Sequence, residues 1–188
     1  VLLAPVHLLW INLVTDSLPA MALGTEPAEK DIMQQRPRNP REGIFANGLG
    51  IGVLWQGVLI GLLTLGSYLL AYFEVHGNYG EEQTAAIATT MAFITLSMCE
   101  IFHSINMRSR IKSIFNIGST NKFIIGSSIL GFILTFGVVY IPGVNDLMNL
   151  VPLDWEYVLT AFGMAICIIP IVEIVKLVQR AILKGKNK

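Results

Sequence analysis

The hydrophobic pattern of the chain consists of five long apolar stretches separated by polar gaps. A helix needs about 20 mostly apolar residues to cross a bilayer, and each stretch meets that length. The stretches cover approximately residues 1–23, 49–73, 85–105, 123–141 and 157–179. We therefore predict an all-α, polytopic membrane protein with five transmembrane helices, in which residues 1–188 form a single membrane domain.

Positive charges occur only in alternate gaps. All 13 Lys and Arg residues fall within residues 30–41, 108–122 and 176–188, whereas Asp and Glu are the only charged residues in the gaps at 74–84 and 142–156. Lys and Arg are enriched in cytoplasmic loops. The pattern therefore predicts that the N-terminus lies outside and the C-terminus lies in the cytoplasm.

Composition supports a membrane protein and argues against nucleic-acid binding, a disulfide framework and a zinc site. The chain is 53% hydrophobic and 14% charged, with a mean hydropathy of +0.61, whereas soluble domains carry about 25% charged residues. A net charge of zero gives no basis for binding nucleic acid. Cys99 and Cys167 lie in apolar segments, which indicates neither a disulfide framework nor a zinc site.

The beginning of the chain is unlike a signal peptide. The first residue is Val1, the apolar stretch starts at once, and the first cation is Lys30. A signal peptide has a basic segment before its apolar run. We interpret the sequence as a fragment of a longer polypeptide.

The first apolar stretch carries an unusual set of oxygen-bearing side chains. Asn12, Thr15 and Asp16 have the i, i+3 and i+4 spacing that places residues on one face of a helix. Pro19 has no N–H to donate to the carbonyl of Thr15, so that carbonyl is loosened. A carboxylate, an amide oxygen, a hydroxyl and a free carbonyl within about one turn indicate a site for a hard cation.

The third apolar stretch contains a second embedded acid, Glu100, between Ser97 and Ser104. An ionisable side chain at membrane depth is costly and marks a functional site by default. The alternative is a protonated glutamate that hydrogen-bonds between helices. His103 lies nearer the cytoplasmic end, and we expect it to be a hydrogen-bonding partner rather than a metal ligand.

The two embedded acids together favour Ca²⁺. Asp16 and Glu100 each lie on the cytoplasmic side of the middle of their helix, and Ca²⁺ takes six to eight oxygen ligands in irregular geometry. The absence of a thiolate or imidazole cluster disfavours zinc and copper. Buried carboxylates also bind protons once the metal leaves, so exchange of a cation for protons is chemically natural.

Three further features complete the sequence-based predictions. The loop at 24–48 contains both charge signs and three prolines, which suits a solvated connector or a docking surface for a cytoplasmic domain.

The second apolar stretch contains two Gly-x-x-x-Gly spacings, formed by Gly48, Gly52, Gly57 and Gly61, which we assign to helix packing. No phosphate-binding loop occurs, so any energy source for transport lies outside this sequence.

The first stretch also carries a family resemblance. Its Leu-Leu-Trp-Ile-Asn-Leu-Val-Thr-Asp-Ser-Leu-Pro-Ala-Met-Ala-Leu-Gly segment, followed by Glu-Pro and Arg-Pro-Arg, resembles the sixth transmembrane helix and following loop of P-type Ca²⁺-transporting ATPases. The similarity is greatest to the sarcoplasmic/endoplasmic reticulum type and its bacterial relatives. The segments around Glu100 and Glu173 resemble the eighth and tenth helices, so five spans would match helices six to ten.

The resemblance implies a function for the parent protein. Asn12, Thr15, Asp16 and Glu100 would be ligands of the transported Ca²⁺, with Pro19 as the helix kink at the site. The other ligands would come from the fourth and fifth helices of the parent. ATP and Mg²⁺ would bind only in its cytoplasmic domains, so this fragment alone should not hydrolyse ATP.

The same resemblance assigns partners and a location. The partners would be the bilayer and the rest of the pump, which would dock partly through the loop at 25–47, with no nucleic acid. The short outer loop at 74–84 favours a bacterial plasma membrane. Two alternatives stay open: the same family with Mn²⁺, Na⁺ or K⁺ as cargo, and a stand-alone channel or assembly module.

Overall fold

The computed structural model describes residues 2–28, 48–109, 111–116 and 121–186, together with single residues 33, 37, 41, 43 and 45. Side chains are described up to residue 182. Most of the loop that the sequence predicts at 24–48 therefore lies outside the described residues. The described part of the chain is helical and contains no β-strand beyond one isolated bridge, between His76 and Tyr79.

The helices follow one another along the chain with short connections. The first apolar stretch forms three consecutive helical segments, which are α1 (Pro5–Trp10), the π-helix η1 (Ile11–Asp16) and α2 (Ser17–Leu23). The remaining elements are α3 (Leu49–Val75), α4 (Glu81–Asn106), the 3₁₀ turn η3 (Ile114–Asn116), α5 (Lys122–Tyr140), the short α6 (Val144–Leu147), α7 (Trp155–Ile166) and α8 (Ile168–Lys186).

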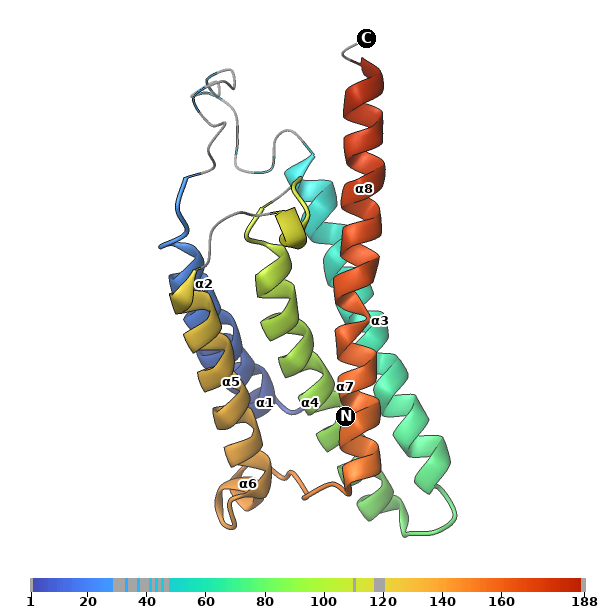
Figure 1. Cartoon of the computed structure of the whole chain (residues 1–188). Helices are drawn as coiled ribbons and strands as arrows, with labels where there is room; N and C mark the ends of the chain where they lie inside the picture. Colours follow the sequence, from blue (N-terminus) through green and yellow to red (C-terminus); the bar gives the residue numbers. More distant parts are fainter. Residues whose placement is uncertain are drawn as a thin grey trace.

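Five helical spans are long and apolar enough to cross a membrane, which confirms the predicted fold class. The spans are Pro5–Leu23, Leu49–Val75, Glu81–Asn106, Lys122–Tyr140 and Trp155–Ile182. The largest extensions beyond the predicted apolar stretches are at the start of α4 and at the end of α8. Helix α4 begins at Glu81 because acidic residues are favourable in the first turn of a helix, and α8 continues past the other helices at its C-terminal end (Figure 1).

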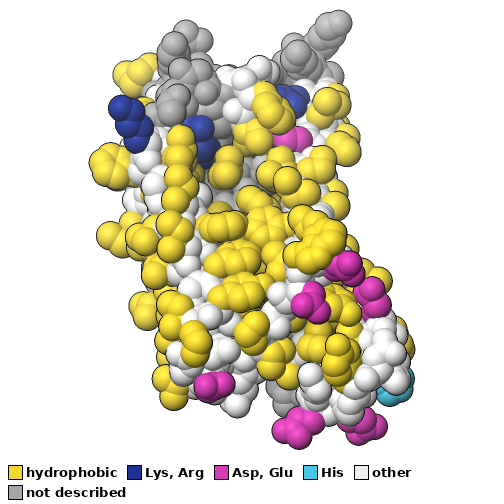
Figure 2. Space-filling view, turned by 60° about the horizontal axis from the view of Figure 1, so that its bottom comes forward, with side chains coloured by type: hydrophobic (Ala, Val, Ile, Leu, Met, Phe, Trp, Pro, Cys, Tyr) yellow, Lys and Arg dark blue, Asp and Glu magenta, His cyan; other side chains and the backbone are white. Residues whose placement is uncertain are grey.

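Basic residues lie at one end of the bundle and most acidic residues at the other, as the sequence predicts. Most of the Asp and Glu visible in Figure 2 lie in its lower half, whereas the visible Lys and Arg lie near the upper end together with one acidic side chain. In Figure 1 the first span, α4 and α8 all run toward the upper end, whereas α3 and α5 run away from it. Under the positive-inside rule the upper end is cytoplasmic, so the chain enters the membrane from outside.

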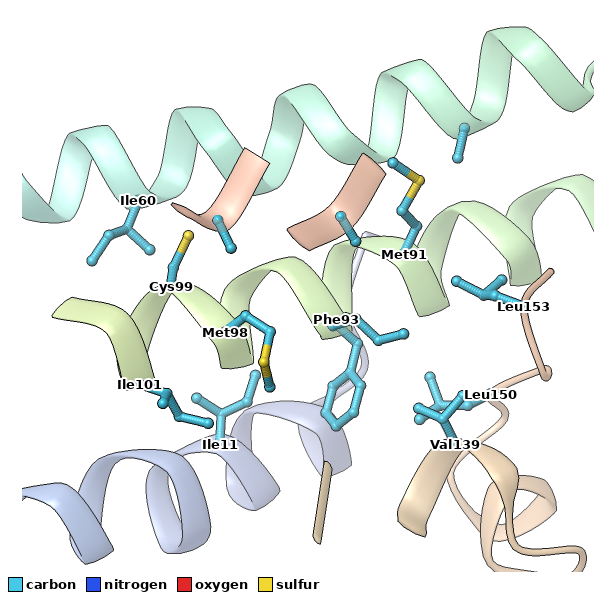
Figure 3. Packing of buried hydrophobic residues seen from close by; sticks show 14 of the residues in the cluster. Ile11, Ile60, Met91, Phe93, Met98, Cys99, Ile101, Val139, Leu150 and Leu153 are labelled. Atoms are coloured by element: carbon cyan, nitrogen blue, oxygen red, sulfur yellow. The ribbon is translucent and has the colours of Figure 1, made fainter. Parts of the chain in front are cut away.

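Helix α4 is the centre of the bundle. In the apolar stretch of α4, 61% of the residues are buried, whereas the buried share of the corresponding stretch is at most 33% in every other span. Its fully buried side chains pack on both sides: Met91 points toward α3, whereas Phe93 and Met98 point toward the first span, as Figure 3 shows. The candidate ligand Glu100 is therefore carried by the helix that the fold positions most firmly.

The glycine pattern in α3 does not pack as predicted. A methyl group added at Gly52, Gly57 or Gly61 would meet no atom of the described chain within 4 Å. Close approach occurs elsewhere, because a methyl group at Gly131 would lie 3.2 Å from the Ile101 side chain and one at Gly66 would lie 3.1 Å from Met164. The predicted close packing on these three glycines therefore does not occur among the described residues of this chain.

Candidate cation site

The first span changes its helix type at the predicted site. Residues Ile11–Asp16 form a π-helix, in which each N–H bonds to the carbonyl five residues earlier. Two side chains bond to the carbonyls of this segment: the Thr15 hydroxyl donates to Ile11 O at 2.9 Å, and the Ser17 hydroxyl donates to Asn12 O at 2.7 Å. The irregular backbone lies directly before Pro19, which cannot donate a backbone hydrogen bond. Such π-turns are frequent at functional sites.

The π-helix changes how the three candidate ligands of this span are arranged. Asn12 is exposed, Asp16 is half-buried and Thr15 is only 1% exposed. A π-helix has more residues per turn than an α-helix, so residues three apart no longer lie on one face. The regular-helix prediction that all three converge is therefore wrong in detail: Thr15 lies in the packed interior, and Asn12 faces away from this bundle.

The structure brings Asp16 and Glu100 together. Both carboxyl groups lie inside spans, both are half-buried, and they are close enough to share a hydrogen bond. An ionised carboxylate can only accept, so a hydrogen bond would form at this contact only with a proton on one of the two groups. The contact fits both interpretations of Glu100, as a cation ligand and as a protonated link between helices.

Two polar groups on α4 flank this contact. The Ser97 hydroxyl and His103 Nδ1 lie one turn to either side of Glu100, and neither has a hydrogen-bond partner within the described structure although both atoms are buried. Buried polar groups are normally hydrogen-bonded. The turn before and the turn after Glu100 therefore each offer a polar atom that no other described group uses.

The described residues supply only part of a coordination shell. No cluster of three or more His, Cys, Asp or Glu side chains in the described part of the chain could hold a metal ion. Asp16 and Glu100 bring carboxylate oxygens together, and Asn12 and Thr15 carry amide and hydroxyl oxygens on other faces of the first span; these are the donor types that Ca²⁺ prefers. Six to eight such oxygens are needed, so this donor set is incomplete by itself.

Polar contacts fix the cytoplasmic end of the bundle. Glu173 and Lys176, three residues apart on α8, form an ion pair at 3.4 Å. Lys176 is 3% exposed and also donates to Asn106 O at 2.7 Å, which joins α8 to the end of α4. A second ion pair, Arg108 to Glu26 at 2.8 Å, was not anticipated, because nothing in the sequence pairs residues so far apart.

The outer end of the first span is held by His7, to which the sequence analysis gave no role. The ring is 1% exposed, its Nε2 lies 2.6 Å from Met148 O, and its Nδ1 accepts from the Ala4 N–H at 3.1 Å. The ring also contacts Phe93, with centroids 5.5 Å apart. These contacts fix the entry of the site helix against α4 and α6.

Comparison with known proteins agrees with the resemblance seen in the sequence. The family model described as "Cation transporting ATPase, C-terminus" matches residues 1–178. The chain is 36% identical to Calcium-transporting ATPase 1 of Bacillus cereus over 193 residues, covering 95% of this chain and 21% of that protein. It is 37% identical to a Calcium-transporting ATPase of Bacillus subtilis over 160 residues, covering 84% of this chain and 17% of that protein.

A plant relative shows that the similarity is not confined to bacteria. The chain is 30% identical to Calcium-transporting ATPase 3, endoplasmic reticulum-type, of Arabidopsis thaliana, covering 95% of this chain and 20% of that protein. The chain thus spans about a fifth of the length of the curated relatives it matches. With its five spans, it is an integral membrane protein region. The chain belongs to the family of cation-transporting ATPase C-terminal regions, and the relatives that it matches are Ca²⁺-transporting ATPases.

Proposed function

We propose that this chain forms the C-terminal membrane domain of an ATP-driven Ca²⁺ pump and contributes one wall of its intramembrane cation site. Asp16 and Glu100 are the acidic ligands, and Asn12 and Thr15 supply further oxygens. The observation that carries the proposal is the carboxyl contact between Asp16 and Glu100 beside the π-helix, within two membrane spans. The exposed face at Asn12 is where helices of the parent protein would add the remaining ligands.

The same contact supports Ca²⁺ efflux with proton countertransport. A hydrogen bond between two carboxyl groups requires a proton, whereas Ca²⁺ coordination requires both groups to be ionised. Binding of Ca²⁺ at Asp16 and Glu100 therefore releases a proton from the pair, and departure of Ca²⁺ allows it to return. This exchange limits the charge left inside the membrane when the cation leaves.

The energy for transport enters through parts of the parent that this chain does not contain. ATP and Mg²⁺ bind in the cytoplasmic domains of the parent, and this chain by itself does not hydrolyse ATP. The loop at 25–47, most of which lies outside the described residues, docks those domains to the membrane site. Similarity to Bacillus proteins, together with the short outer connection between α3 and α4, supports a bacterial plasma membrane as the location.

The proposal is tested by ATP-dependent ⁴⁵Ca²⁺ uptake into inverted vesicles that contain the full-length parent. We expect Asp16→Asn to abolish uptake, because it removes a charged ligand while preserving side-chain volume. Asp154→Asn, a change at an exposed acid in the outer loop before α7, is the matched control and should leave uptake unchanged. Undiminished uptake by Asp16→Asn would contradict the assignment of the site.

Two further measurements on the same vesicles test the cargo and the counterion. Competition of ⁴⁵Ca²⁺ uptake by Mn²⁺, Na⁺ and K⁺ identifies the cargo, and we expect all three to compete weakly. Pyranine trapped inside the vesicles reports the internal pH, which should rise during uptake as protons leave. A constant internal pH under short-circuit conditions would contradict countertransport and leave the Ca²⁺ assignment standing.

A further inference from the structure

The site helix and α4 are joined a second time, at the cytoplasmic end of the bundle. Glu26 follows the end of α2, and Arg108 follows the end of α4. Arg108 Nη2 donates to Glu26 Oε1 at 2.8 Å, and Arg108 Nε lies 3.1 and 3.2 Å from the two oxygens of the same carboxylate. The side chains are only 12% and 13% exposed, so this is a bidentate pair shielded from solvent rather than a surface contact.

A third residue locks the pair to α5. Asn121 Nδ2 donates to Glu26 Oε2 at 2.7 Å and to Ala22 O at 3.2 Å. Its Oδ1 accepts from the backbone N–H groups of Phe123 and Ile124, which caps the N-terminus of α5. Asn121 is 4% exposed, and both ends of its amide are used. Glu26, Arg108 and Asn121, hereafter the Glu26 cluster, thus connect three spans at one level.

The cluster and the cation site are two contacts between the same two helices. After Asp16 the helix α2 continues for seven residues, and after Glu100 the helix α4 continues for six, which at 1.5 Å per helical residue is about 10 Å and about 9 Å. Two contacts at different levels along the same pair of helices fix both the register and the relative rotation of those helices. With one contact removed, the helices can slide or turn about the other.

We infer that the Glu26 cluster positions Asp16 and Glu100 for cation binding, by holding the site helix and α4 in register from the cytoplasmic side. The inference rests on the proposed function, because it concerns affinity at that site. The cluster does not touch the cation, so its residues are positioning residues. Because Glu26 begins the loop at 25–47, the cluster also joins that loop to the helix that carries Glu100.

The inference predicts a loss of Ca²⁺ affinity without loss of the fold. Arg108→Gln and Glu26→Gln in the full-length pump should each raise the half-saturating Ca²⁺ concentration for ATP-driven uptake by about tenfold, within the roughly 5- to 150-fold range of coupling between sites. The maximal rate at saturating Ca²⁺ should change less than twofold. The matched control is Arg180→Gln, which neutralises a partly exposed cation near the cytoplasmic end of α8 and should leave the half-saturation unchanged.

A charge exchange separates positioning from general destabilisation. The double variant Glu26→Arg/Arg108→Glu restores opposite charges, so its half-saturation should lie closer to wild type than that of either single variant. Elution as a single monodisperse peak in detergent size exclusion checks that each variant is folded. Unchanged half-saturation in folded single variants, or a double variant no better than the singles, would overturn the inference alone. A wild-type pump that takes up no Ca²⁺ would instead overturn the proposed function, and the inference with it.

Discussion

Replacement of Glu100 by Gln probes the cation site with the least disturbance of the fold. Glutamine has nearly the volume of glutamate, and its amide can still donate a hydrogen bond to Asp16, so the contact between the site helix and α4 is retained. The substitution removes one negative charge from a pair of carboxylates. A contact to a charged group contributes about 1.5–3 kcal/mol, so Ca²⁺ affinity should fall by about 10- to 150-fold.

The assay for Glu100→Gln is equilibrium ⁴⁵Ca²⁺ binding to membranes that contain the full-length parent without ATP. The affinity and the number of ions bound are both measured, and a loss of one bound ion per pump would assign Glu100 to the site of that ion. Glu82→Gln is the matched control, because Glu82 is exposed at the outer end of the same helix. Unchanged affinity and stoichiometry for Glu100→Gln would refute the ligand role and leave Glu100 as a link between helices.

Two further substitutions test the packing that holds the site. Lys176→Met leaves the Glu173 carboxylate and Asn106 O without their buried cation. It should destabilise the protein by about 3 kcal/mol and lower its thermal denaturation midpoint in detergent. The control Arg180→Met, one turn further along α8, should have little effect on that midpoint. Gly131→Val forces a branched side chain against Ile101 and should cost about 1–3 kcal/mol, whereas Gly57→Val meets open space; equal midpoints for the two glycine variants would contradict the packing described for α4 and α5.

The fold could be predicted from the sequence because membrane spans depend on local composition. Apolar length identified all five spans, and the distribution of Lys and Arg fixed their direction. The glycine pattern in α3 failed for a different reason. A small residue permits close approach but does not say which neighbour is there, and no described atom of this chain lies within 4 Å of a methyl group added at Gly52 or Gly57.

The candidate site was predictable in its chemistry but only partly in its geometry. Ionisable residues are rare inside spans, so Asp16 and Glu100 could be identified from the sequence, and the structure brings them together. The π-helix could not be predicted, because Pro19 shows only that a hydrogen bond is missing. The Glu26 cluster joins residues 82 and 95 positions apart. Of its members only Asn121 carried a local signal, as an Asn directly before an apolar helix.

The central claim is that Asp16 and Glu100 bind the transported cation together. It is tested most directly by a cryo-electron microscopy map of the full-length parent in Ca²⁺, compared with a map in EGTA. We predict density in the Ca²⁺ map alone, at about 2.3–2.6 Å from carboxylate oxygens of both residues, with the direct hydrogen bond between them lost. A Ca²⁺ map in which the two carboxyl groups keep their hydrogen bond, with ion density elsewhere, would contradict the account.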